Sequence, residues 1–437
     1  MRKRKFRSIL AGAGAAAFMA AVLAGCGNTG IPGDLMQDLD SARNLEEPSG
    51  GSSGNLEEPS GDNGKNPGGA EAVTDFGVRL LQQVLEGDKN VLLSPLSVAS
   101  ALAMTANGAE GDTLSQMEAV LGMPVQELSE WLHTYREALP RGEKYRLDLA
   151  NAIWFAEKEG FTVEQEFLQA NQDYFDAGLY QVPFEASVAG DINQWVEERT
   201  DGRIREIVTK VSPDAVMYLV NALVFDAQWQ EIYRENQVRE RDFTREDGTV
   251  QKVEMMHSAE SQYLTDGQAE GFIKYYEEGE YAYVALLPRE GLTVSEYVAS
   301  LTGEGLRQML LSPVSGYVDA AVPKYKSEYG ISLEEALQEM GMQNAFDELR
   351  ADFSGIGYSV EGPVYISQVL HKTFMAVDER GTRAGAATVV EMEEGGGGFA
   401  EEIQTVYLDR PFLYMIVDCR TMVPVFMGTV MDPGAEN

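Results

Sequence analysis

The sequence of 437 residues has few of the side chains on which most catalytic and metal sites depend. It has two cysteines and three histidines, His133, His257 and His371. It contains no Gly-x-Ser-x-Gly elbow, no His-Glu-x-x-His motif and no paired-cysteine spacing, and the tetraglycine at 395–398 lacks the Lys-Ser/Thr of a phosphate loop. Nothing in the sequence therefore indicates an enzyme, a cofactor or a metal site.

The two cysteines, Cys26 and Cys419, lie in different surroundings. Residues 1–25 combine a basic head with an apolar stretch, which is the architecture of an export signal. The Leu-Ala-Gly-Cys sequence ending at Cys26 resembles a bacterial lipoprotein box, in which the cysteine is lipidated; the alternative is a plain secretory peptide with an incidental cysteine. Cys419 lies in an apolar run and is expected to be a small buried side chain, so no intradomain disulfide can form. We expect export, with anchoring to the bacterial cell surface or outer membrane, or release outside the cell.

Basic residues are scarce, with 34 Lys and Arg against 70 Asp and Glu and a net charge of −36. Five basic residues and no acid precede Cys26, so from Cys26 onward 29 basic and 70 acidic residues give −41. A surface this acidic repels phosphate backbones, which argues against nucleic acid and favours basic partners. Because Arg136, Arg141, Lys144 and Arg146 are interspersed with acids, a glycosaminoglycan site is not expected.

Residues 26–70 lack the apolar side chains that a core requires. The heptapeptide NLEEPSG occurs at 44–50 and again at 55–61, with Gly, Ser, Asn and Pro around it. Such a composition is typical of a flexible tether, with a reach of roughly 35–40 Å. From residue 71 to 437 the composition shows no further break, which indicates one folded domain. We expect this protein to be a monomer.

The periodicity of apolar residues predicts helices early in this domain and strands late. Helices are expected at 74–85, 96–106, 113–121, 127–139, 163–175 and 191–200. Ser94-Pro95 would cap the second of these, Thr113 would open a capping box, and Gly122 would end the third. Strands are expected at 147–155, 217–225, 282–287, 317–322, 364–377, 412–418 and 423–430. This order favours a mixed α+β domain over an alternating one.

The segment from 377 to 402 has strand alternation that ends in a flexible tip. Uncharged residues occupy one parity, at Thr382, Ala384, Ala386, Thr388, Val390 and Met392. The charges at Arg383, Glu391 and Glu393 occupy the other parity, and the pattern fails at Glu394 before four glycines. A connection this long is either a surface loop rich in small residues or a segment held out of a sheet that could accept it.

Several separated motifs, in order along the chain, resemble those of the serpin family from residue 74 to 433. They are NVLLSPLS at 90–97, INQWV at 192–196 with TDGRI at 200–204, LVNA at 219–222 followed by Phe225 and Trp229, DFT at 242–244, SQVLHK at 367–372, the run beginning Gly381-Thr382, RPF at 410–412 and FMG at 426–428. This resemblance implies helices packed around three β-sheets, with an exposed reactive-centre loop. It also implies suicide inhibition of serine proteases through a covalent 1:1 complex, in which the cleaved loop inserts into the central sheet.

The resemblance also assigns residues to parts of that mechanism. The hinge of the loop would comprise Gly381, Thr382, Ala384, Ala386, Ala387 and Thr388. The shutter, a buried polar network where the central sheet parts, would comprise Ser94, Ser97, Asn221 and His371. Trp229 would lie at the breach, where the loop first enters the sheet.

The scissile bond is the least constrained part of this assignment. The usual spacing from Gly381 ends at Glu394, Gly395 and Gly396, whereas counting back from Pro411 ends near Phe399 and Ala400, and Met392 lies close by. We favour the window 393–396. Other possible functions are inhibition of cysteine proteases, a non-inhibitory serpin and a surface binding module.

Overall fold

The computed structural model describes residues 67–139, 144–157, 159–175, 177–212, 215–358, 360, 362–382 and 403–435. Its helices are α2 (Pro67–Val84), α3 (Pro95–Ala106), α4 (Gly111–Leu121), α5 (Val125–Glu137), α6 (Gln165–Phe175), α7 (Val188–Arg199), α8 (Val294–Ser300), α9 (Gly303–Leu311) and α10 (Glu334–Glu339). Within these described ranges no helix is both long and apolar enough to span a membrane. The first helix already includes residues 67–70, ahead of the expected start of the domain.

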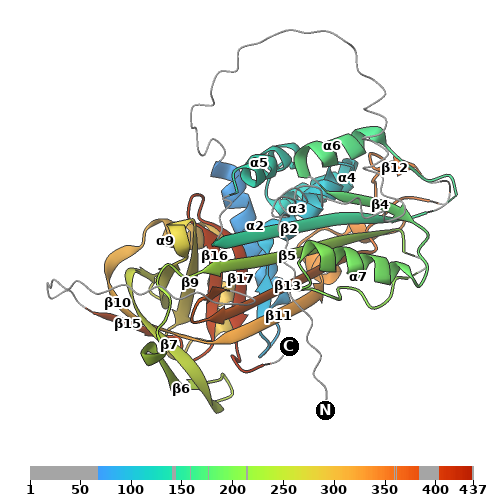
Figure 1. The fold of residues 1–437 in the computed structure, drawn as a ribbon. Helices are drawn as coiled ribbons and strands as arrows, with labels where there is room; N and C mark the ends of the chain where they lie inside the picture. Colours follow the sequence, from blue (N-terminus) through green and yellow to red (C-terminus); the bar gives the residue numbers. More distant parts are fainter. Residues whose placement is uncertain are drawn as a thin grey trace, which may run out of the picture.

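The strands fall into three sheets, and they are β1 (Val91–Leu93), β2 (Tyr145–Ala156), β3 (Thr162–Val163), β4 (Gly178–Val182), β5 (Met217–Gln228), β6 (Val238–Thr244), β7 (Val250–Thr265), β8 (Ala269–Tyr275), β9 (Tyr281–Pro288), β10 (Val314–Pro323), β11 (Tyr325–Ser332), β12 (Gly357–Tyr358), β13 (Gln368–Asp378), β14 (Gly381–Thr382), β15 (Gln404–Tyr407), β16 (Phe412–Asp418) and β17 (Val423–Val430). The central sheet has the order β11-β13-β14-β5-β2-β4 and runs across the middle of Figure 1. The largest sheet has the order β1-β17-β16-β9-β8-β7-β10-β15, with β6 on β7, and β12 pairs with β3. The expected α+β architecture with three sheets is confirmed.

The central sheet is buried on both faces, which explains the nearly continuous apolar sequence of β5. On one face, odd-numbered residues of β5 such as Leu223 and Phe225 join the main core with α2, α3 and the largest sheet. On the other face, even-numbered residues such as Val224 join a smaller cluster beneath α7, together with Trp154 and Trp195. Figure 1 shows α7 lying over this sheet.

The predicted caps at the ends of α3 and α4 are confirmed in part. The side chain of Ser94 accepts a hydrogen bond from the Ser97 amide and Pro95 is the first helical residue, so the expected cap of α3 is confirmed. Gly122 ends α4 in the left-handed region, as expected. The capping box at Thr113 is wrong, because α4 already begins at Gly111 and the Thr113 hydroxyl instead accepts from the Asp352 amide, 3.0 Å away.

The strand expected from residue 364 begins only at Gln368. The preceding segment bonds to other elements instead. The Ile366 amide donates to Ala345 O, and the Ser367 amide donates to Met217 O.

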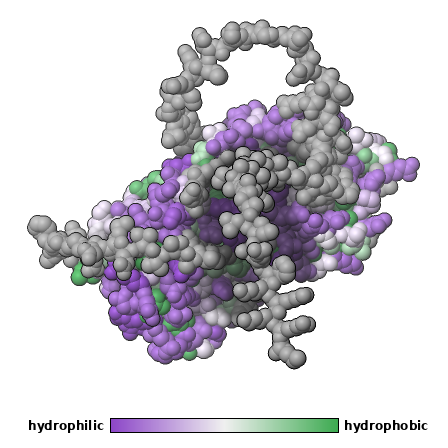
Figure 2. Space-filling view, viewed as in Figure 1, coloured by the Kyte–Doolittle hydropathy of each residue, from purple (hydrophilic) through white to green (hydrophobic). Residues whose placement is uncertain are grey.

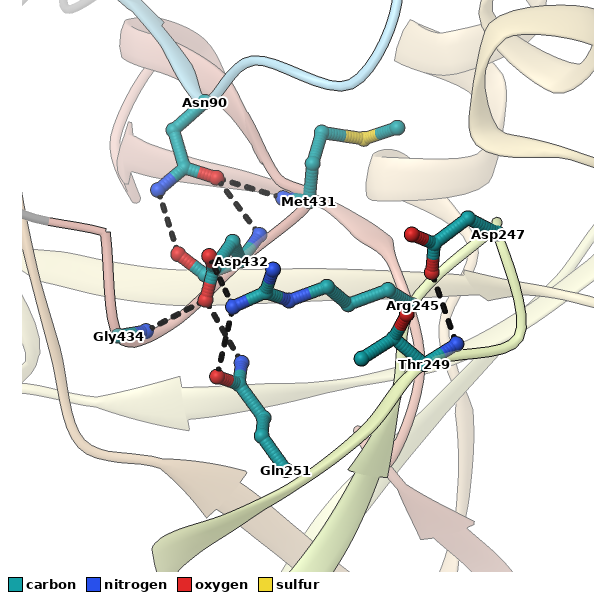
Figure 3. Close-up of polar contacts among 8 residues, drawn as sticks. All are labelled: Asn90, Arg245, Asp247, Thr249, Gln251, Met431, Asp432 and Gly434. Carbon is teal, nitrogen blue, oxygen red and sulfur yellow. Dashed lines mark hydrogen bonds and ion pairs between the residues drawn. The ribbon is translucent and has the colours of Figure 1, made fainter.

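A polar clasp joins the C-terminal end of the domain to β1 and to the turn between β6 and β7 (Figure 3). Asn90 Oδ1 accepts from the amides of Met431 and Asp432, and Asn90 Nδ2 donates to Asp432 O at 2.7 Å. The Asp432 carboxylate contacts Arg245 at 2.5 Å and accepts from Gln251 Nε2 at 2.7 Å. Segments more than 300 residues apart are thereby fixed side by side.

Candidate functional site

A short strand occupies the head of the central sheet between β13 and β5. After β13 the chain turns at Glu379 and Arg380 and returns as β14, which pairs antiparallel with both neighbours. Thr382 lies opposite Val377 of β13 and Ala227 of β5. The expected hinge therefore begins inside the sheet, at its upper end.

The residues that follow β5 hold this turn in place. The Trp229 amide donates to Arg380 O at 2.8 Å, and Trp229 Nε1 donates to Asp378 O at 2.8 Å. The Tyr233 amide donates to Glu379 O at 2.8 Å. The sequence predicted Trp229 near the loop entry but gave no signal for Tyr233.

Gly381 is required by the close approach of β14 to β5. A Cβ atom at this position would lie 1.9 Å from Ala227 O, and the φ angle of +156° disfavours other residues. Any side chain here would push β14 away from β5. The glycine at the start of the hinge is thus explained by its backbone environment.

Thr382 is fully buried, and its hydroxyl lies 2.6 Å from the hydroxyl of Tyr276. The Tyr276 ring stacks on Trp229, with 4.4 Å between centroids. Burial raises the pKa of Tyr276 well above its usual value, so this phenol stays protonated and can hydrogen-bond. Tyr276 was not predicted, because a tyrosine between strands carries no distinctive sequence signal.

Below β14 the two strands that flank it pair directly with each other. Residues 368–374 of β13 pair parallel with residues 218–224 of β5. The central sheet is therefore separated by β14 at its head and closed beneath it. A further strand could enter only where this parallel pairing gives way.

Three of the four expected shutter residues form a chain of hydrogen bonds across that closed region. The Ser94 amide donates to His371 Nε2 at 3.1 Å, so His371 Nδ1 carries the proton and donates to Asn221 Oδ1 at 2.6 Å. Asn221 Nδ2 donates to the Ser97 hydroxyl and to Asn151 Oδ1. The Ser94 side chain is the exception, since it caps α3.

Burial lowers the pKa of His371 to about 3, so the imidazole is neutral at ordinary pH. Asn151 of β2 completes the network and was missed by the sequence reading. Its signal was a polar residue in the middle of an apolar strand, directly opposite Asn221 in the register.

Two lysines, neither predicted, lie beside the hinge. Lys324 contacts Glu379 and, at 3.2 Å, Glu254. The buried Lys274 contacts Glu260 at 3.0 Å and lies over the ring of Trp229, 5.5 Å from its centroid. Burial opposes the charge of Lys274, but its neighbours raise its pKa, so the ammonium remains charged.

The remaining expected site residues lie outside the described residues. They are Cys26, the hinge residues Ala384, Ala386, Ala387 and Thr388, and the candidate scissile positions Met392, Glu394, Gly395, Gly396, Phe399 and Ala400. Among the described residues, no group of three or more His, Cys, Asp and Glu side chains could hold a metal ion. Cys419 is half-buried, and burial raises the pKa of its thiol to about 12.

The fold and this site define a protein with a 6-stranded central sheet in which a short strand, β14, separates β13 from β5 at one end. The model of the family described as serpin (serine protease inhibitor) matches residues 71–433, and the chain belongs to this family. Its members are generally protease inhibitors rather than catalysts.

Individual relatives agree with this membership. An uncharacterised serpin-like protein of Thermococcus kodakarensis is 32% identical over 371 residues, covering 83% of this chain and 85% of the relative. The crystal structure of a thermophilic serpin, tengpin, in the native state has a TM-score of 0.81 and 40% identity, covering 92% of this chain and all of the other. A complex of thyroxine-binding globulin with thyroxine has a TM-score of 0.73 and 25% identity, covering 84% and 99%.

Proposed function

We propose that this serpin inhibits serine endopeptidases as a suicide substrate whose cleaved loop enters the central sheet. The observation that supports this most directly is β14, which lies between β13 and β5 and is antiparallel to both. Extending β14 downward would add a complete strand at this position. The alternate residues from Thr382 onward are uncharged, which is the pattern expected of such a strand.

The register of β14 indicates where each hinge residue would lie after insertion. Each residue further along the loop matches one residue back along β13 and β5. Ala384 would lie opposite Met375 and Phe225, which belong to the main core. Ala386 would follow opposite Thr373 and Leu223. The alternate small, uncharged residues of the loop would thus face the core, and Arg383 would face the side of α7.

The same register brings Thr388 opposite His371 and Asn221. These two side chains hydrogen-bond directly across the closed part of the sheet. A strand that passes between them must break that bond, and the Thr388 hydroxyl would replace part of it. In this proposal the shutter network resists spontaneous insertion and yields when the loop is cut.

The energetics of insertion depend on burial and strand pairing. Ordering the loop costs about 1–2 kcal/mol per residue, and strand hydrogen bonds return about 0.5–1.5 kcal/mol each. Because these nearly cancel, the exchange of one parallel pairing for two antiparallel pairings, which are slightly more stable per residue, becomes important. Burial of Val390 and Met392 would add roughly 1.5–3 kcal/mol each.

The chemistry of trapping would come from the protease. Its catalytic serine attacks the loop carbonyl, the peptide bond breaks, and an ester joins the enzyme to the new carboxyl end of the loop. The new amino end remains with the segment leading to β15. We place the cleaved bond in the window of Glu394, Gly395 and Gly396, with Met392, Phe399 and Ala400 as alternatives.

A protease panel tests the inhibitory function. Trypsin-like, chymotrypsin-like, elastase-like, glutamate-specific and papain-like proteases would be incubated with the full chain. We expect a 1:1 complex with a serine protease that survives denaturing electrophoresis, and mass spectrometry of the released peptide would identify the cleaved bond. Covalent trapping of the papain-like enzyme alone would redirect the proposal to cysteine proteases.

Clean cleavage by every enzyme in the panel would refute inhibition and favour a non-inhibitory binding module. Thyroxine-binding globulin, a structural relative named for the ligand it binds, gives that alternative a precedent in the same fold.

We further propose that the protein is exported and anchored through a lipid on Cys26, with residues 27–70 as the tether. The basic head, apolar stretch and Leu-Ala-Gly-Cys sequence support this. Radioactive palmitate should label the wild-type protein but not Cys26→Ala in its native host. Equal labelling of both would refute the anchor.

We further propose that the partners are basic proteins, that the protein is a monomer, and that it binds neither nucleic acid nor glycosaminoglycan. The described surface supports these proposals. Figure 2 shows a predominantly hydrophilic face wherever residues are coloured. Arg136 contacts Glu137, and Arg146 contacts Asp201, so neither guanidinium is available to bind sulfates freely. Arg141, the third arginine of that group, lies outside the described residues.

A further inference from the structure

A polar pocket of about 580 Å³ opens beside the hinge. It lies where β7 separates from β8, because these strands pair only between residues 263–265 and 270–272. Its walls include Glu231 shortly after β5, Glu260 and Gln262 of β7, Lys274 and Tyr275 of β8, and Tyr317 of β10. Residues from the central sheet's extension and from the largest sheet therefore meet around one space.

Two carboxylates, those of Glu231 and Glu260, lie on the walls of this pocket. Lys274 is the only cationic residue that lines it, and its ammonium is already paired with Glu260 Oε1. The Ser258 hydroxyl also donates to Oε1, so Oε2 of Glu260 has no hydrogen-bond donor among the described residues. Glu231 is exposed, and its charge is one of those that raise the pKa of Lys274.

The pocket also offers aromatic surface. Tyr275 and Tyr317 contribute to the lining, and Tyr317 is about half exposed. Two carboxylates with free oxygens beside phenol rings form an environment that suits a planar or compact cation. The net charge of −36 further raises the local concentration of cations.

We propose that this pocket binds a guanidinium or primary ammonium group. The cation would lie between Glu231 and the free oxygen of Glu260 and would contact the ring of Tyr317. A free small molecule and the basic side chain of a partner protein share this chemistry. The neutral polar groups nearby, including Gln262, would accept its remaining hydrogens.

A series of contacts connects the pocket to the hinge. Glu260 holds Lys274, Lys274 lies over Trp229, and Trp229 stacks on Tyr276, which hydrogen-bonds Thr382. A cation that bridges Glu231 to Glu260 would tie the end of β5 to the largest sheet. The binding does not depend on the proposed function. The coupling does, because in the proposed mechanism β5 must separate from β13 as the loop enters.

Calorimetry with butylguanidinium on the full chain at low salt tests the binding. We expect 1:1 binding, no binding of butylurea, which is its neutral isostere, and a roughly tenfold loss of affinity in Glu231→Gln, the size expected for one charge-assisted hydrogen bond. Glu335→Gln is the matched control, since Glu335 lines a separate acidic pocket near α10 and its loss should change nothing.

Several outcomes would overturn the site. Absence of binding at millimolar butylguanidinium would do so. Equal binding to wild type and Glu231→Gln would indicate a non-specific counter-ion and would do so as well. A short capped peptide with one arginine distinguishes the sources: if it competes, the pocket admits a partner's side chain, and if only butylguanidinium binds, the site takes small molecules.

The coupling has its own test. Once a protease that this protein traps has been identified, saturating butylguanidinium should raise the number of inhibitor molecules consumed per protease. Glu231→Gln should remove that effect. An unchanged number would refute the coupling. Calorimetry requires no protease, so the binding site and the inhibitory function can fail independently.

Discussion

The hydroxyl oxygens of Thr382 and Tyr276 lie 2.6 Å apart, and both side chains are fully buried at the head of the central sheet. This contact fixes the first inward-facing residue of the loop before any cleavage. It also defines which parity faces the core, because Thr382 pairs with Ala227 and Val377. The tolerance of each hinge position to substitution follows from this parity.

Thr382→Arg should convert the protein from an inhibitor into a substrate. The position is fully buried, and burial of an uncompensated charge costs several kcal/mol. Insertion would then be slower than release of the cleaved loop. Titration of protease against inhibitor should show many molecules cleaved for each protease trapped.

Two variants control for this effect. Thr382→Val keeps the volume and removes only the hydroxyl, so it should retain most trapping. Arg383→Ala changes the neighbouring outward residue and should leave trapping intact. If Thr382→Arg traps protease as completely as wild type, the inward parity has been assigned wrongly.

The sequence predicted elements with a strong apolar or capping pattern well and elements without one poorly. The continuous apolar run of β5 and the caps of α3 were evident because burial and capping each leave a local signal. Strands β6, β7 and β11 were missed because most of their residues are not buried and none of them has the continuous apolar sequence of β5, so their pairing depends on neighbours far along the chain.

The candidate site shows the same division. Gly381 and Thr382 belong to one recognisable segment, whereas Lys274 in β8, Tyr276 just after β8 and Asn151 in β2 meet the hinge or shutter only after folding. No spacing rule connects residues that are brought together by tertiary structure. Polar residues inside apolar strands were the one signal that could have found Asn151.

His371 should make the fold sensitive to mild acid. Its pKa is about 3 in the fold and about 6.5 when unfolded, so the unfolded chain binds a proton that the folded chain excludes. The stability that neutral His371 contributes above pH 6.5 is therefore lost as the pH falls toward 3. Between pH 7 and pH 5 the loss from this residue should be about 2 kcal/mol.

Urea unfolding of wild type and His371→Gln at both pH values measures this loss. The glutamine can still accept from Ser94 and donate to Asn221, so the network keeps its contacts without a titrating group. The difference between the two proteins cancels the contribution of carboxylates. Identical pH slopes would show that His371 does not titrate in this way.

Asn90→Ala should destabilise the domain by about 2–4 kcal/mol, because it leaves the Met431 and Asp432 amides without their acceptor in a buried region. The expected result is a lower thermal midpoint. Asn236→Ala, at an exposed position outside the clasp, should shift the midpoint little. Equal shifts for both variants would mean that the clasp of Figure 3 contributes nothing to stability.

Cleavage of the loop should make the protein more stable, which is the reverse of what nicking does to most domains. In the described state β13 and β5 are joined by a parallel pairing that a cut loop could replace with two antiparallel ones. Under the proposed function, the uncut molecule therefore stays in the state of higher free energy until the loop is cleaved. Limited proteolysis with a non-target enzyme near the tetraglycine, followed by a thermal scan, measures the difference. The nicked protein should melt at a clearly higher temperature, and Thr382→Arg should reduce that gain, because its charge would hold the start of the hinge out of the sheet and would have to be buried for the strand to insert. An unchanged melting temperature in nicked wild type would mean that no energy is stored for trapping a protease.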